Sequence, residues 1–116
     1  MTADSPSPGL SDAQYRTAIA EVLNRIESTV DRWLQSDEAD IDSERSGNML
    51  TLTLPNRSQL IINAQPPLHE LWLAARRGGY HFKHTDGQWV DTRHQLEFFA
   101  LLSDCASEQA GTALTF

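Results

Sequence analysis

The sequence predicts an α+β two-layer sandwich, with two helices packed on one face of a five- to six-stranded antiparallel sheet. A helical apolar period runs through residues 12–35, and a second one lies near the C-terminus. Between them, residues 41–91 consist of short segments that are separated by turn residues. Helix, strands and helix in this order place both helices on one side of the sheet and leave its other face open. A chain of 116 residues is long enough for one such core.

The first helix is predicted for residues 12–35. Apolar side chains recur there every three or four residues, as on one face of a helix: Tyr15, Ile19, Val22, Leu23, Ile26, Val30 and Trp33. Ser11 and Gln14 have the spacing of a capping box, so the helix is expected to begin directly after Ser11. The preceding residues are rich in Ser, Pro and Asp. We therefore expect residues 1–10 to be a mobile tail and residues 11–116 to form a single domain.

The middle of the chain is predicted to form short strands with period-two alternation. A first strand begins at Ile41, and three leucines alternate with two threonines in residues 50–54. Further strands are expected at 58–63, 69–75, 80–84 and 88–91, with reversals at Gly47-Asn48, Pro55-Asn56, Pro66-Pro67, Gly78-Gly79 and Asp86-Gly87. Alternation in the segment 69–75 directs Leu71 and Leu73 inward. It directs Glu70 and Trp72 toward the open face.

A second helix is predicted from Arg93 to about Gln109, with Thr92 and Gln95 as a possible cap. Its apolar stripe comprises Leu96, Phe99, Leu102 and Ala106, widened by Phe98, Leu101 and Cys105. Because Cys105 lies on this stripe, we expect it to be a buried small hydrophobic residue. Gly111 is the expected stop, and the apolar tail 112–116 is expected to pack back on the fold.

The charge of the chain lies in its N-terminal part. Residues 1–44 hold ten of the sixteen carboxylates and three of the nine Lys and Arg, a net of −7, whereas residues 45–116 are neutral. This balance disfavours nucleic acid and anionic membranes as partners and favours cations or a basic protein face. No apolar run approaches the length of about 20 residues that spans a bilayer. Without a signal peptide, and with one cysteine, the chain is expected to be cytoplasmic.

Catalytic motifs are not evident in the sequence. It has no Gly-rich phosphate loop, nucleophile elbow or zinc-ligand spacing, so we expect no enzyme. Heptads and a large apolar surface are also missing, which makes a monomer the expected state. His81 and His84 are three residues apart in a predicted strand and would face opposite sides. All four histidines are therefore left out of the candidate site.

Seven carboxylates cluster between residues 27 and 44: Glu27, Asp31, Asp37, Glu38, Asp40, Asp42 and Glu44. The first two are four residues apart on one helix face, and the last three alternate, which would direct them from one face of a strand. Hard oxygen donors suit Fe(III), Ca(II) and Mn(II), and also Fe(II). A solvated ridge of this kind implies weak, exchangeable binding. The alternative is a solvated acidic face that keeps an edge strand from pairing.

The sheet region contains IINAQPPLHELWLA, GGYHF and WVDTR in this order. With Asn63, Gln65, Pro67, Trp72 and Leu73 in these positions, it resembles the frataxin family, and most closely its bacterial branch. The resemblance covers nearly the whole chain from Ser11 onward. It implies a small iron-binding protein of iron–sulfur cluster assembly. Such a protein associates with the cysteine desulfurase and its scaffold and moderates the rate of assembly.

The resemblance also assigns roles to residues. It implies that the seven carboxylates bind iron, Fe2+ or Fe3+, weakly, and that other hard divalent cations can substitute. Ser28 and Arg32 stand where a close bacterial relative is more often acidic, so residues 37–44 are expected to carry more of the binding. The residues expected to contact partners are Asn63, Gln65, Glu70 and Trp72. Rival functions are an iron chaperone that donates iron to the scaffold and an iron-oxidising storage enzyme, whose His and bridging Glu centre the sequence lacks.

Overall fold

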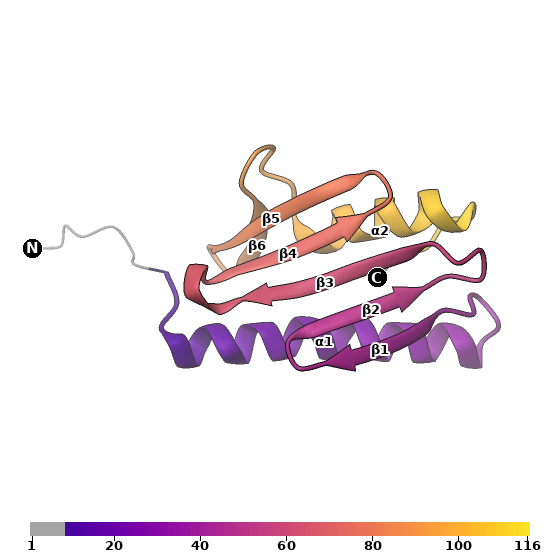
Figure 1. The fold of residues 1–116 in the computed structure, drawn as a ribbon, viewed down its shortest axis with the longest axis horizontal. Helices are drawn as coiled ribbons and strands as arrows, with labels where there is room; N and C mark the ends of the chain where they lie inside the picture. The colour runs from indigo at the N-terminus through magenta and orange to yellow at the C-terminus, as the bar shows by residue number, and fades with distance from the viewer. Residues whose placement is uncertain (1–8) are drawn as a thin grey trace, which may run out of the picture.

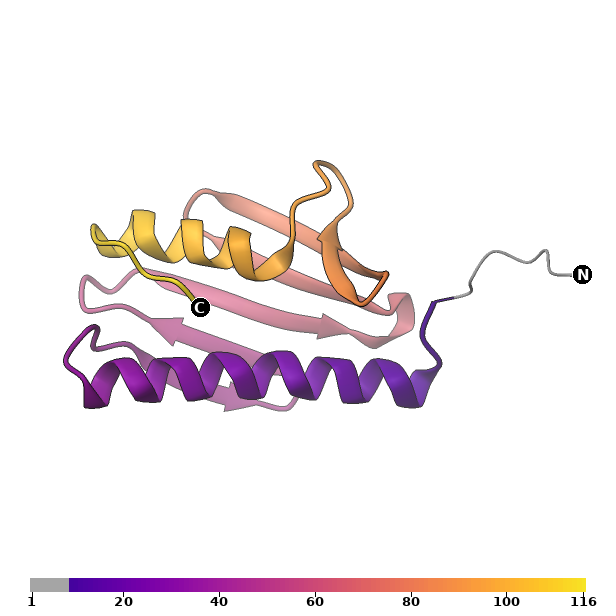
Figure 2. The ribbon, with the colours of Figure 1, turned by 180° about the vertical axis from the view of Figure 1, so that it is seen from behind.

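A six-stranded antiparallel sheet forms one layer of the protein and two helices form the other (Figure 1). Figure 2 shows both helices on the same face of the sheet, so the predicted architecture is confirmed. The structure is a computed structural model that describes residues 9–116. Of the expected tail, residues 1–8 lie outside the described residues. None of the helices in residues 9–116 is long and apolar enough to cross a membrane.

Helix α1, Asp12–Gln35, has the predicted bounds. The capping box is present: Gln14 N–H donates to Ser11 Oγ at 3.1 Å, and Ser11 N–H donates to Gln14 Oε1 at 2.9 Å. These two bonds satisfy backbone donors that the first helical turn leaves free. All seven apolar residues of the predicted face are buried against the sheet.

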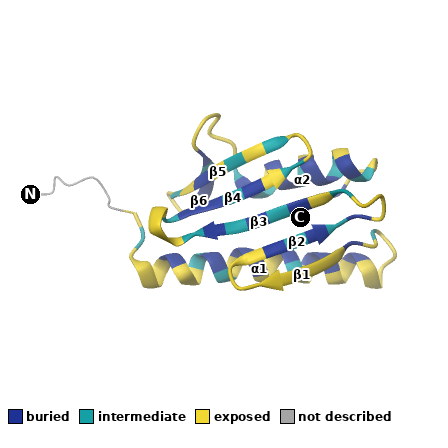
Figure 3. Cartoon of the chain, in the orientation of Figure 1, coloured by how far each residue is buried: buried dark blue, intermediate teal, exposed yellow. Residues whose placement is uncertain are grey.

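The six strands form a meander in which every strand pairs with the one before it. They are β1 Asp42–Ser46, β2 Met49–Thr53, β3 Gln59–Gln65, β4 Glu70–Ala75, β5 Gly78–Thr85 and β6 Gln88–Asp91, with a 3-10 turn η1 Pro66–Leu68 between β3 and β4. Buried and more exposed residues alternate along β2 and β3 as predicted (Figure 3). Asp86 and Gly87 both have positive φ, 51° and 81°, as a type I′ hairpin turn requires.

The reversal between β4 and β5 differs from the prediction. Arg76 and Arg77 form the turn, and Gly78 and Gly79 are already paired in β5. The turn is held from outside the hairpin, because Arg76 N–H donates to Gln109 Oε1 at 2.9 Å. The predicted reversal at Gly78-Gly79 was therefore wrong by two residues. As a result, Trp72 pairs with His81.

The second helix, α2 Phe98–Ala110, begins five residues later than predicted. Asp91 explains the difference, since one of its carboxylate oxygens accepts the backbone N–H of His94 at 2.6 Å and folds the segment into a turn. Gln95 then takes a positive φ of 62°, and the Glu97 side chain caps the helix. The proposed cap of Thr92 and Gln95 was wrong. Leu96 is 45% exposed and lies before the helix rather than on its apolar stripe.

The C-terminal tail packs back on the helix layer, as predicted. Leu114 and Phe116 are buried, and the Phe116 ring lies 4.7 Å from that of Trp33 in an edge-to-face arrangement. Ser103 and Ser107 of α2 hold the tail, because their hydroxyls accept the backbone N–H groups of Phe116 and Leu114. Cys105 is fully buried, which confirms its expected place in the core.

Stability is expected to fall as the pH rises above about 9, near the ordinary pKa of a thiol. Burial raises the pKa of both the Cys105 thiol and the Tyr15 hydroxyl, and both are neutral in the fold. The unfolded chain loses these protons at lower pH than the folded chain does. The stabilisation is thus complete below the unfolded pKa values and is lost as the pH rises through the folded ones.

Urea unfolding midpoints measured from pH 7 to 11 test this expectation. Cys105→Ala should be less stable at neutral pH and should lose less stability between pH 8 and 10 than the parent protein does. An identical slope in the two proteins would contradict the assignment to the thiol.

Candidate functional site

The predicted partner-binding residues come together on the open face of the sheet. Directly opposite residues in a sheet share a face. The register therefore aligns Asn63, Trp72 and His81 in one row across β3, β4 and β5. The next row contains Gln65, Glu70 and Lys83. Figure 1 looks onto this face, with β3, β4 and β5 side by side.

Trp72 is the centre of a compact cluster in these two rows. Its ring stacks on the His81 ring, with centroids 4.1 Å apart and planes within 7°. Its indole N–H donates to Glu70 Oε1 at 2.8 Å. The other oxygen of that carboxylate lies 3.8 Å from Lys83 Nζ. Trp72 is half-buried, so the cluster presents part of an aromatic side chain to solvent.

Glu70 differs from its prediction in one respect. Alternation correctly predicts that Glu70 faces the open side of the sheet, but the residue is buried, with 9% of its surface exposed. Trp72, His81 and Lys83 surround the carboxylate, which therefore cannot serve as a freely solvated contact. His81 and Lys83 are members of the site that the sequence did not reveal. A reversal placed at Arg76-Arg77 would have revealed them, because it pairs Trp72 with His81.

The acidic residues of β1 lie at the edge of the sheet. All five residues of β1 are exposed. Asp42 and Glu44 pair with Thr53 and Thr51, so they face the open side of the sheet. Arg45 pairs with the buried Leu50 and thus faces α1.

Arg45 links this strand to the helix. Its guanidinium donates to Glu27 Oε1 at 2.9 Å and to Asn24 Oδ1 at 3.1 Å. Glu27 is therefore already neutralised by a neighbouring cation. Among the predicted metal ligands, it is the one whose carboxylate has an ion pair in the described structure.

The seven carboxylates occupy three different settings. Glu27 and Asp31 belong to α1, Asp37, Glu38 and Asp40 to the connection after it, and Asp42 and Glu44 to β1. Asp40 precedes β1, so alternation along the strand puts only Asp42 and Glu44 on one strand face. The prediction that Asp40 shares this face with them was wrong. No group of three His, Cys, Asp or Glu among residues 9–116 is arranged to hold a metal ion. The arrangement can attract cations to an exposed edge without enclosing them.

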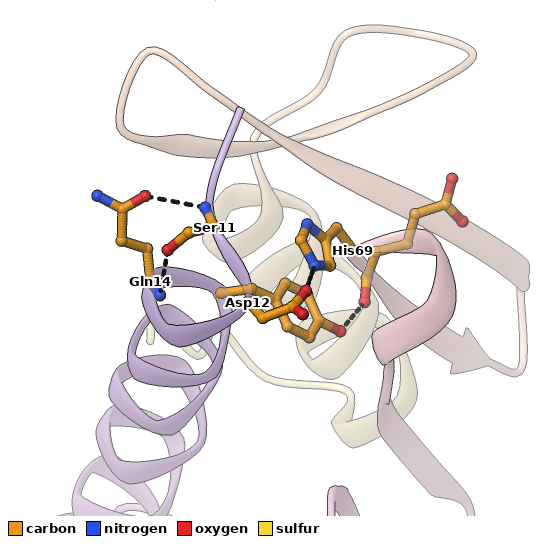
Figure 4. Close-up of polar contacts among 6 residues, drawn as sticks. Ser11, Asp12, Gln14 and His69 are labelled. Carbon is orange, nitrogen blue, oxygen red and sulfur yellow. Dashed lines mark hydrogen bonds and ion pairs between the residues drawn. The ribbon is translucent and has the colours of Figure 1, made fainter. Parts of the chain in front are cut away.

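A hollow of about 480 Å³ lies beside the N-terminal half of α1. Its lining includes Asp12, Arg16, Arg45 and His69 and none of the predicted site residues. Figure 4 shows His69 Nε2 against Asp12 Oδ1, 2.6 Å apart, next to the capping box. The His69 ring also stacks on Tyr15, with centroids 4.7 Å apart. These contacts fasten the turn before β4 to α1 and so position the strand that carries Trp72.

The fold is that of a known class of small α+β proteins. A family model described as a frataxin-like domain matches residues 8–112. The chain belongs to this frataxin-like family. The resemblance inferred from the sheet motifs is thereby confirmed.

Relatives of similar length share about half of the sequence. The chain is 50% identical over 105 residues to the iron-sulfur cluster assembly protein CyaY of Albidiferax ferrireducens, covering 90% of this chain and 96% of the relative. It is also 50% identical over 107 residues to the protein of the same name from Paraburkholderia xenovorans, covering 92% and 98%.

Solved structures agree with the fold. The frataxin of Psychromonas ingrahamii superposes with a TM-score of 0.80 at 31% identity, covering 91% of this chain and 97% of that one. Trimeric frataxin from Saccharomyces cerevisiae, described as complexed with ferrous, superposes with a TM-score of 0.65 at 22% identity, covering 93% of each chain. At that identity the yeast protein supports the fold alone.

Proposed function

We propose that this protein is an iron-dependent regulator of iron–sulfur cluster assembly that acts on the complex of cysteine desulfurase and scaffold. The observation that carries the proposal is the pairing of an exposed acidic sheet edge with an adjoining open face centred on Trp72. Relatives at half identity are named iron-sulfur cluster assembly proteins, which supports a role in that pathway. The protein would work as a monomer in the bacterial cytoplasm.

Iron is the proposed ligand of the carboxylates from Glu27 to Glu44. Oxygen donors on an exposed edge suit Fe2+ and Fe3+, and other hard divalent cations can substitute. Glu27 must leave Arg45 before it can bind metal, so Asp37, Glu38, Asp40, Asp42 and Glu44 are proposed to contribute more. Because these side chains are exposed, bound iron exchanges readily and salt weakens its binding.

Docking on the desulfurase is proposed to use the acidic edge, and docking on the scaffold side to use Asn63, Gln65 and Trp72. A partner with a basic face would be drawn to β1 by charge complementarity. The half-buried Trp72 is the kind of aromatic anchor on which interface energy concentrates. Control of assembly would then be steric and electrostatic. Iron bound at β1 would lower the negative charge that the desulfurase meets, which makes regulation responsive to iron.

An iron chaperone is the second candidate. The same observation favours it, since a solvated set of carboxylates releases metal readily. In that case, protein loaded with iron would supply the scaffold faster than free iron of equal concentration. Regulation predicts instead that protein loaded with iron supplies the scaffold no faster than free iron of equal concentration.

Cluster assembly on purified scaffold with desulfurase, followed over a range of iron concentrations, tests the proposal. We expect this protein to change the assembly rate in a manner that depends on iron. The form with Asp40, Asp42 and Glu44 replaced by lysine should leave the rate at its value without added protein. If both forms leave the rate unaltered at every iron level, the regulatory function is refuted.

A further inference from the structure

We propose that Glu70 is a positioning residue that holds the indole of Trp72 in one arrangement on the open face, ready for a protein partner. The inference rests on the proposed function, in which Trp72 contacts the assembly complex. It assigns Glu70 a role different from the direct contact that its position in the sequence indicates. The residue acts through Trp72 and does not itself touch the partner.

The burial of Glu70 is the first observation. The Glu70 side chain is only 11% exposed on a sheet face without a covering layer, so it has lost most of its water. Burying a charge is unfavourable unless donors replace that water. The surrounding side chains must therefore be arranged around the carboxylate.

Three side chains approach the carboxylate. The Trp72 indole N–H is the closest and donates a hydrogen bond of 2.8 Å to Oε1. Lys83 Nζ lies 3.8 Å from Oε2, and His81 Nδ1 lies 3.9 Å from Oε1. Both of the longer contacts come from β5, so the carboxylate joins two neighbouring strands on one face.

The backbone of Glu70 is itself fixed. Its carbonyl oxygen accepts the hydroxyl of the buried Tyr15 at 2.6 Å, which ties the beginning of β4 to α1. Glu70 pairs with Gln65 of β3 on one side and with Lys83 of β5 on the other. The carboxylate is thus presented from a rigid point in the fold.

Trp72 is consequently held at two places. Glu70 binds its N–H, and His81 covers one face of its ring with nearly parallel planes. A rotation of the indole about either side-chain bond would break the hydrogen bond and the stacking together. The free protein therefore already has the aromatic surface that a partner would contact, and binding needs little further ordering of that side chain.

Two substitutions separate positioning from charge. Glu70→Gln keeps an oxygen that can accept the indole N–H and removes the negative charge. Glu70→Leu keeps a similar size and removes the acceptor. Glu21→Gln, on the exposed side of α1, is the matched control for loss of one carboxylate. Thermal unfolding of each variant first establishes that it folds.

The readout in the free protein is the indole N–H resonance of Trp72, assigned with Trp72→Phe. We expect Glu70→Leu to shift this resonance and to speed its exchange with water, while Glu70→Gln and Glu21→Gln leave that exchange slow. An unchanged resonance in folded Glu70→Leu would overturn the proposal. Equal disturbance by Glu70→Gln and Glu70→Leu would also overturn it, because charge rather than the acceptor would then hold the indole.

Affinity for the desulfurase–scaffold complex tests the consequence separately. We expect Glu70→Leu to bind about tenfold more weakly and Glu70→Gln to stay within about threefold of the parent. Trp72→Ala distinguishes a failure of docking through the open face from a failure of positioning by Glu70. Full affinity in Trp72→Ala would refute docking through the open face, and the indole readout would still decide the positioning. Lost affinity in Trp72→Ala with full affinity in Glu70→Leu would overturn the positioning role in binding.

Discussion

Replacing Asp40, Asp42 and Glu44 together by lysine is expected to weaken binding to the cysteine desulfurase at least about a hundredfold. All three side chains are exposed, and β1 lies at the edge of the sheet, where a partner can approach. A basic face that is attracted by three carboxylates would instead meet three ammonium groups. Like charges brought together across an interface cost several kcal/mol, which is the origin of this magnitude.

The measurement is the dissociation constant at two salt concentrations. Raising the salt should weaken binding of the parent protein and should affect the reversed form much less, because screening acts on attraction between exposed charges. The matched control reverses Glu21, Asp104 and Glu108, which are exposed residues of the helix layer. Both variants change the net charge from −7 by +6, to −1. If they lose affinity equally, net charge is responsible and the acidic edge is not a specific docking surface.

Gln109→Leu is expected to lower the free energy of unfolding by about 3 kcal/mol. Gln109 is 3% exposed and uses both ends of its amide. Its oxygen accepts the Arg76 N–H at 2.9 Å, and its nitrogen donates to Ser58 Oγ at 3.0 Å and Gln59 O at 3.2 Å. Leucine has a similar volume but no hydrogen-bonding groups, so it would remove all three bonds at about 1 kcal/mol each.

Urea unfolding gives the free energy, and thermal unfolding should show a melting temperature lower by roughly 10–20 °C. The matched control is Gln88→Leu at an exposed position of β6, which should change stability by less than about 0.5 kcal/mol. Equal stability of Gln109→Leu and the parent would mean that water satisfies the freed groups. The hairpin of β4 and β5 would then not depend on α2.

The elements that the sequence predicted correctly are those that depend on neighbours in the chain. The period of α1 and its cap are set by residues within one turn of each other, and both are confirmed. Alternation of Leu50, Leu52 and Leu54 with threonine likewise identifies the buried face of β2. The outward direction of Trp72 follows from the same local rule.

The errors arise where a distant group decides the outcome. Gln109 of α2 holds the turn at Arg76 by a hydrogen bond, and the residues around Gly78 and Gly79 do not predict that bond. Burial of Glu70 depends on His81 and Lys83, whose pairing follows from this turn. The open-face direction of Asp42 is set by its pairing with β2. The sequence thus indicated the outward direction of Trp72 and Glu70, and the cross-strand register added His81 and Lys83 beside them.

The meander described above also bears on how the molecule folds. Each strand lies next to its predecessor in the chain, and the connections between strands span only two to five residues. The sheet can therefore form hairpin by hairpin, with short loops to close. Helix α1 makes its contacts far along the chain instead, from Tyr15 to Trp89 and from Trp33 to Phe116. Docking of α1 and the C-terminal tail closes much longer loops than strand pairing does, so we expect it to be the slower step of folding.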